Sequence, residues 1–190
     1  MTIDRPITDD RDLEKAITAM VLRALQLATT WVRWDGQPLR ADGRDFTPHK
    51  AMRRIADHMV DHLAQLESHL AGVESLPDEW QGSAITTPCD LAPFGEEDLA
   101  EARSRLTRLA QLWRIRLRSI PEEDLDRAQG DGYTPREMAF CALESISYAE
   151  VVGDRTDADR SLAEDRRFYR GQQGVGSIRG RPRLRRAATT

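Results

Sequence analysis

The segment spanning residues 46–70 constrains the fold of this chain more than any other stretch. Thr47 and Pro48 mark the start of a helix, because threonine accepts a free N–H of the first turn and proline at the first helical position sacrifices no hydrogen bond. The segment therefore predicts one long amphipathic helix with a sharp start. Its apolar stripe consists of Met52, Ile55, Ala56, Met59, Leu63, Leu66 and Leu70.

All four histidines of the chain, including His49 in the first turn, lie in this predicted helix. His58, His62 and His69 are separated by steps of four and seven, so they share one flank of the apolar stripe. His58 and His62 can present two imidazoles to one metal ion. With Asp61 the sequence reads H-x-x-D-H, but the similar peptidase motif needs a glutamate and a distant third ligand. The commoner alternative is a pair of histidines at the core edge, hydrogen-bonded to carboxylates or water.

A first helix is predicted near the N-terminus, where Thr8, Asp9 or Asp10 can cap it. Its apolar positions, spaced by three and four, are Leu13, Ile17, Met20, Ala24, Leu27 and Trp31. The stripe is widened on one side by Val21, Leu25, Ala28 and Val32. A face this broad predicts a homodimer, because exposed apolar patches mark interfaces. The alternative is a helix packed between two others of the same chain.

Two further helices complete the pattern. Residues 34–44 form a loop with two Asp-Gly pairs, and residues 71–95 form a long connection broken by glycine and proline. A third helix follows, with Leu99, Ala102, Leu106, Leu109, Trp113, Leu117 and Ile120 in its stripe. The fourth begins at the T-x-x-E capping box of Thr134 and Glu137. No strand pattern competes, so the sequence predicts an all-α fold of four helices in which the long crossover makes helices 2 and 3 parallel.

Charge divides the chain into two parts. Residues 166–186 contain eight arginines and no acidic residue. Because the net charge of the whole chain is −4, the remaining residues together carry −12. We expect residues 1–155 to form the helical domain and residues 156–190 a charged, Gly/Arg-rich tail, largely disordered after a short helix over residues 157–169. An acidic body argues against nucleic-acid binding, and only the tail is suited to an anionic partner.

Other features indicate a cytoplasmic protein. No apolar run approaches the ~20 residues that span a bilayer, and the acidic N-terminal segment has no apolar core of a secretion signal. Cys89 and Cys141 lie far apart and in no C-x-x-C pair, which argues against a disulfide framework or a zinc ribbon. We therefore expect no membrane association and reduced thiols.

Residues 47–66 (TPHKAMRRIADHMVDHLAQL) and 134–150 (TPREMAFCALESISYAE) form an internal repeat. In order and spacing, with the long crossover between them, they resemble the DinB/YfiT-like superfamily over about residues 9–153. The resemblance implies an up-down-down-up four-helix bundle of bacterial type. Proteins of that superfamily include mycothiol- or bacillithiol-dependent S-transferases and maleylpyruvate isomerases.

The same resemblance implies a divalent Zn²⁺ or Ni²⁺ ion held by three histidines, or by two and a carboxylate, from helices 2 and 4. On helix 2, His58 and His62 stand at or near those positions. Helix 4 contains no histidine. Its corresponding positions are Cys141 and Ser145, and the displaced alternatives are Glu144 and Tyr148. The resemblance thus gives a candidate metal set of His58, His62, Cys141 and Glu144.

Two functional hypotheses remain open. In the first, a small-molecule site in the bundle belongs to a metal-dependent thiol S-transferase or hydrolase. The small inward residues of helix 4, such as Ala142 and Ser145, favour it because they leave room for a ligand. In the second, a non-catalytic dimeric binding or interaction protein has lost the metal, which the missing histidines favour. Cys141 is then a buried packing residue, as free cysteines commonly are.

Overall fold

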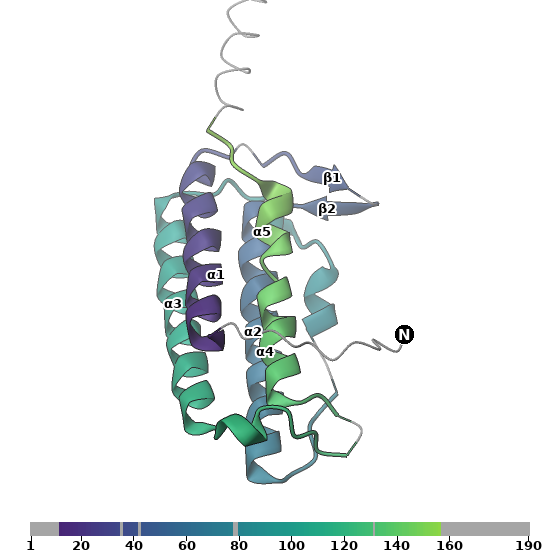
Figure 1. Cartoon of the computed structure of the whole chain (residues 1–190). Coiled ribbons are helices and arrows are strands. Elements are labelled where there is room, and N and C mark those ends of the chain that lie inside the picture. Colours follow the sequence, from purple (N-terminus) through teal and green to yellow (C-terminus); the bar gives the residue numbers. More distant parts are fainter. Residues whose placement is uncertain (1–11, 35, 42, 78–79, 131, 157–190) are drawn as a thin grey trace, which may run out of the picture. The chain divides into compact units, whose positions relative to one another are not determined.

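The computed structural model describes residues 12–34, 36–41, 43–77, 80–130 and 132–156. This part of the chain is mostly helical and carries one small sheet (Figure 1). The predicted tail, apart from Thr156, lies outside the described residues. The helices are α1 (Leu13–Ala28), α2 (Pro48–Ala71), α3 (Glu96–Ser119), α4 (Pro135–Glu144) and α5 (Ser147–Val152), the strands are β1 (Leu39–Ala41) and β2 (Arg44–Phe46), and the 3-10 turns are η1 (Thr29–Trp31), η2 (Trp80–Ala84), η3 (Pro88–Leu91) and η4 (Glu122–Asp124).

Helix α1 is buried along its whole apolar stripe. The helix begins after Asp12, whose carboxylate accepts a hydrogen bond from the backbone N–H of Lys15 at 3.2 Å. The expected caps Thr8, Asp9 and Asp10 lie outside the described residues.

The widened edge of α1 is covered within the chain. Val21 and Leu25 are buried and Val32 is half-buried, because α3, α4 and α5 all pack against α1. The expectation that this edge is exposed was therefore wrong. The covered edge gives no support to a homodimer through α1. Helix α1 instead packs between other helices of the same chain, which was the alternative interpretation.

Helix α2 begins and ends at the residues that its sequence indicates. The Thr47 hydroxyl accepts a hydrogen bond from Lys50 N at 3.2 Å, and Pro48 occupies the first turn. Gly72 ends the helix in the left-handed conformation at φ 67°, which glycine adopts without strain. Of the predicted stripe, Leu63 is half-buried and Leu70 is exposed. The other five residues are buried, which confirms that face up to Leu66.

Ion pairs at the helix ends show how α1, α2 and α3 run. His49 Nε2 lies 3.9 Å from Asp98 Oδ2 at the start of α2 and α3, and Arg116 pairs with Glu67 toward their ends. Helices α2 and α3 are therefore parallel. Arg118 near the end of α3 pairs with Glu14 at the start of α1, so these two are antiparallel. The crossover between α2 and α3, with η2 and η3, returns the chain along α2 (Figure 1).

The predicted fourth helix is divided into α4 and α5. It opens with the expected capping box of Thr134 and Glu137. At Ser145 the backbone N–H donates three residues back to Ala142 O at 3.3 Å, and the side-chain hydroxyl donates to the same carbonyl at 2.7 Å. A serine hydroxyl that competes for a helix carbonyl tightens the turn locally. The expectation of one continuous helix was wrong at this point.

The two strands were not expected. Leu39 pairs with Phe46 in an antiparallel hairpin whose turn includes Gly43 at φ 72°. An Asp-Gly pair favours this tight turn, because both central residues of the commonest hairpin turn need positive φ. Leu39 and Phe46 are partly buried and pack on the helical core. The second half of the predicted loop is therefore a hairpin that leads directly into α2.

Two buried tryptophans join the helices through their indole N–H groups. Trp113 on α3 donates to Met59 O on α2 at 3.1 Å. Trp31, in η1 after α1, donates to Gly153 O after α5 at 2.7 Å, and its ring meets Phe94 edge-on at 6.0 Å. Each indole thus combines a large buried surface with a hydrogen bond between distant segments.

We predict that Trp31→Phe lowers the free energy of unfolding by ~1–3 kcal/mol, since it leaves a cavity and removes the bond to Gly153 O. Urea unfolding at equilibrium measures this as a lower midpoint. Leu22→Ala is the control, because Leu22 lies on α1 but is 62% exposed. It is expected to stay within ~0.5 kcal/mol of the wild type. Equal losses in the two variants would contradict the assigned role.

Candidate functional site

Four basic residues form a buried row on α2. Lys50, Arg54, His58 and His62 follow one another at intervals of four, so they lie along one face of the helix. Their exposed fractions are only 6%, 4%, 6% and 2%. We call these four residues the basic row. Burying charge is costly unless polar partners compensate, so the partners of each residue define what the row can do.

Lys50 connects three segments at the start of α2. Its Nζ donates to Asp45 O at 2.9 Å and to Thr86 Oγ1 at 2.8 Å. The hairpin and the crossover are thereby both attached to α2. Burial lowers the pKa of Lys50, because water no longer solvates the ammonium fully.

Arg54 lies one turn further along and connects α2 to α5. Its Nη2 donates to Tyr148 Oη at 2.6 Å, and Nη1 donates to Ser83 Oγ at 3.3 Å. The guanidinium carbon also lies 4.4 Å from the centre of the Tyr148 ring, a cation–π distance. Hydroxyl groups from η2 and α5 therefore bind a charge that is largely buried.

The two histidines are in direct contact. Their Nε2 atoms lie 2.9 Å apart, and His62 Nδ1 lies 2.7 Å from Gln65 Oε1. With the Gln65 oxygen as acceptor, His62 carries its proton on Nδ1 and, when neutral, accepts a hydrogen bond from His58 Nε2–H. Burial first, then the charges of His62 and Arg54, lower the pKa of His58 to about 4, against an opposing effect of Asp61. His58 is thus neutral at pH 7.

A pocket of about 530 Å³ lies beyond His62, between the end of α2 and the start of α4. Gln65 and Tyr133 line it, and both contact His62: Gln65 through the hydrogen bond, and Tyr133 through a ring placed edge-on at 6.3 Å. His69 and Glu74 also line the pocket. Its volume is in the range of small-molecule sites.

The structure brings together two of the four predicted metal ligands. His58 and His62 are in contact, whereas Cys141 is half-buried and Glu144 is exposed. Among the described residues, no group of three or more His, Cys, Asp and Glu side chains is arranged to hold a metal ion. The described donors therefore supply two imidazoles and lack the third ligand of a tight site.

Sequence reasoning passed over Lys50 and Arg54. The signal that identifies them is the interval of four, which continues upstream from His58 and His62 along the same face. Ser83 and Thr86 carry no comparable signal, because residues of a crossover become neighbours of α2 only through the fold. Tyr148, considered as a displaced metal position, instead binds Arg54.

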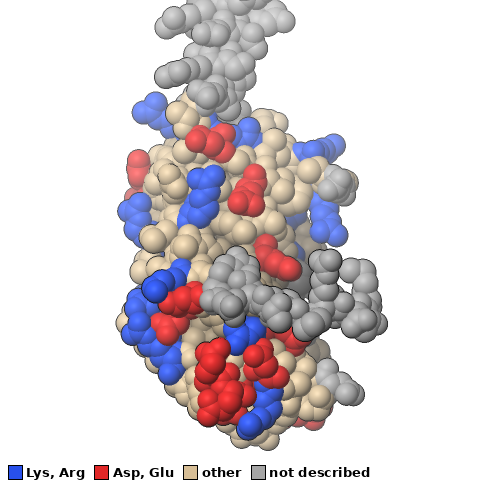
Figure 2. All heavy atoms as spheres, in the orientation of Figure 1, with Lys and Arg blue, Asp and Glu red and all other residues tan. Residues whose placement is uncertain are grey.

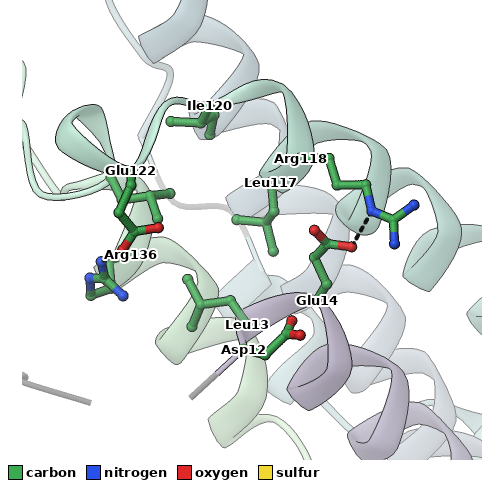
Figure 3. Close-up of a pocket in the computed structure, with 9 residues that line it drawn as sticks. Asp12, Leu13, Glu14, Leu117, Arg118, Ile120, Glu122 and Arg136 are labelled. Carbon is green, nitrogen blue, oxygen red and sulfur yellow. Dashed lines mark hydrogen bonds and ion pairs between the residues drawn. The ribbon is translucent and has the colours of Figure 1, made fainter. Parts of the chain in front are cut away.

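A second hollow, of about 440 Å³, lies between the start of α1 and the end of α3 (Figure 3). Its charged residues are all paired: Arg118 binds Glu14, Arg136 binds Glu122 and also Asp126 outside the hollow, and Asp12 binds Lys15. Acidic side chains gather at this end of the molecule with arginines among them (Figure 2). Paired charges of this kind join helix ends, so we assign no site there.

None of the helices that the structure describes combines the length and apolar character needed to cross a bilayer. No protein-family model, curated protein or solved structure matches this chain.

The neutral state of His58 predicts a pH-dependent stability. Its pKa of about 4 in the folded chain lies below the 6.5 of an ordinary histidine. The unfolded chain therefore binds more protons between these values, and stability is lost as the pH falls from 6.5 toward 4. This group should remove ~2 kcal/mol from the free energy of unfolding between pH 7 and pH 5.

Denaturant titrations at the two pH values measure the loss, and His58→Gln should show a smaller one because glutamine does not titrate. His69→Gln is the control, since His69 is half-buried beside the pocket and outside the histidine contact. Equal pH dependence of His58→Gln and the wild type would refute the assignment.

Proposed function

We propose that this chain is a small-molecule-binding protein, built as a divergent DinB-like four-helix bundle of up-down-down-up topology. In this proposal α4 and α5 together form the fourth helix. Support comes from the directions of α1, α2 and α3, from the crossover before α3, from the Thr-Pro starts of α2 and α4, and from the capping box of α4. The internal repeat falls on α2 and α4–α5, which pack against each other.

The proposed ligand site is the pocket beside His62. The observation that carries it is that Gln65 and Tyr133 line this pocket and also contact His62, which connects an open cavity to the buried histidine pair. The wall offers an amide, a phenol ring and the imidazole of His69. Such a wall suits a compact polar molecule with an aromatic or flat group, held by stacking and a few hydrogen bonds.

Binding without catalysis is the function that this geometry supports best. The alternative is the metal-dependent thiol S-transferase or hydrolase that the family resemblance implies. One observation favours the alternative: the imidazoles of His58 and His62 lie together, with their Nε2 atoms only 2.9 Å apart. The donor set among the described residues does not fit a three-ligand metal, because Glu144 is exposed and no third ligand joins the pair. We therefore derive no metal-dependent step.

A fragment screen by ¹H–¹⁵N NMR tests the pocket. Fragments that bind there are expected to shift the side-chain amide of Gln65 and the imidazole of His62, with Kd values near 1 mM that are usual for small weak ligands. Ser75→Trp places an indole in the pocket and should abolish these shifts, since Ser75 lines it and is exposed. Ser104→Trp, on an exposed position of α3, should leave them unchanged. Hits that survive Ser75→Trp would place the site elsewhere.

Elemental analysis separates the two candidate functions. We expect purified protein to carry well under one Zn²⁺ or Ni²⁺ per chain, because two imidazoles alone hold a divalent ion weakly. Added Zn²⁺ should raise the unfolding temperature only slightly. Near-stoichiometric metal that disappears in His58→Ala would instead establish a metal centre and make the transferase or hydrolase the leading candidate.

A further inference from the structure

The outer sides of α2 and α3 carry charges that complement one another. We propose that they form the interface of a homodimer, in which α2 of each protomer lies against α3 of its partner. This surface is distinct from the edge of α1, which is covered within the chain. It also shares no residue with the pocket beside His62, so the proposal does not depend on the function assigned to that pocket.

Two stripes of residues make up the surface. Their members recur at intervals of three or four along each helix, and none of them is buried. The stripe on α2 consists of Arg53, Asp57, Val60, Ala64 and Glu67, and that on α3 of Glu101, Arg105, Arg108, Leu112 and Arg116. The ion pair between Glu67 and Arg116 joins the two stripes, so they lie side by side. We call them together the α2–α3 face.

The middle of the α2–α3 face is apolar. Val60 is 51% exposed and Leu112 is 48% exposed, and Ile115 beside Leu112 is 52% exposed. Ala64 is also exposed, one turn beyond Val60. Single apolar residues at a surface are common, so the charges on either side of this group decide whether it is an interface.

Ion pairs between α2 and α3 show which of their residues lie at the same level. The pair of His49 with Asp98 and the pair of Glu67 with Arg116 each span 49 positions of the sequence. Because the two helices are parallel, a residue of α2 is level with the residue 49 positions later on α3. Asp57, for example, is level with the turn of α3 between Arg105 and Arg108.

A two-fold axis parallel to the helices would place each α2 opposite the partner's α3 at the same level. Along the two stripes, each charge then meets the opposite charge, and the apolar residues meet one another. From the start of the helices to their end, the opposed sets of α2 and the partner's α3 are Arg53 with Glu101, Asp57 with Arg105 and Arg108, Val60 and Ala64 with Leu112, and Glu67 with Arg116. An axis across the middle of the helices would instead place Arg108 opposite its own copy.

Asp57 and Arg108 gain most from this arrangement. Within the described chain neither side chain has an ion-pair partner, and the dimer supplies one to each. Complementary charges of this kind mainly fix the register of an interface and exclude wrong partners. The α2–α3 face extends ~21 Å along α2 and is two helices wide, which is at the low end of dimer interfaces. We therefore expect a reversible dimer with a Kd of ~10 μM.

Sedimentation velocity of the full chain tests the dimer. The mean mass should rise from the 21.5 kDa of one chain toward twice that value as the concentration increases from ~1 to ~300 μM. Leu112→Asp should weaken association ~10-fold or more, because it places a carboxylate in the apolar middle of the interface. Leu22→Asp is the matched control, since Leu22 is 62% exposed on α1, and it should associate like the wild type. The mass of one chain at every concentration, or equal association of the two variants, would overturn the proposal.

A mixing experiment tests the pairing of α2 with the partner's α3. Asp57→Arg and Arg108→Asp each set like charges against one another at both symmetry-related contacts, so each variant alone should associate ~10-fold more weakly than the wild type. In a dimer of one variant with the other, both contacts again join a cation to an anion. An equimolar mixture should therefore recover association.

A mixture that associates no better than its two components would refute this pairing, and with it the proposed interface. Circular dichroism verifies beforehand that both variants are folded. If either variant fails to fold, the comparison of Leu112→Asp with Leu22→Asp still decides the proposal.

Discussion

Burial of the basic row on α2 is the constraint to which the surrounding structure is adapted. The hairpin, the crossover and α5 each supply a polar atom to this face: Asp45 O and Thr86 to Lys50, and Ser83 and Tyr148 to Arg54. Without these partners the cost of removing two cations from water would exceed what the neighbouring apolar contacts return. The crossover and α5 are therefore held against α2 by polar bonds as well as by apolar packing.

This arrangement explains how a long crossover stays in place. Several of its large apolar residues, including Leu76 and Ile85, are exposed, so apolar burial contributes little there. Its fixed points are polar: Arg53 binds Asp90 and the carbonyl of Ile85, and Asp90 caps η3 through Thr87. A crossover held in this way depends on the arginines of α2 for its position.

The small inward residues of α4 and α5 have a structural use. Ala142, Ser145 and Ala149 are buried, and both helices pack closely on α2 and α1. The open space lies instead at the two ends of the α2–α4/α5 seam, beside Tyr133 and beside Tyr148. The seam thus has a closed middle, where the histidines meet, and a pocket at each end. Small residues allowed close helix contact here, and bulkier ones would have separated the helices.

Local sequence determined the helices of this protein. Periodic apolar residues predicted the buried stripes of α1 and α3, and Thr47-Pro48 and the Thr134 capping box predicted helix starts, because caps and periodicity act within a few residues. Sequence also placed His58 and His62 on one flank. Tertiary structure alone decided that Lys50 and Arg54 are buried with them, that residues 39–46 pair as a hairpin against the core, and that the edge of α1 is covered. These outcomes depend on segments far apart in the chain, and no local pattern specifies which of them will lie against a given face.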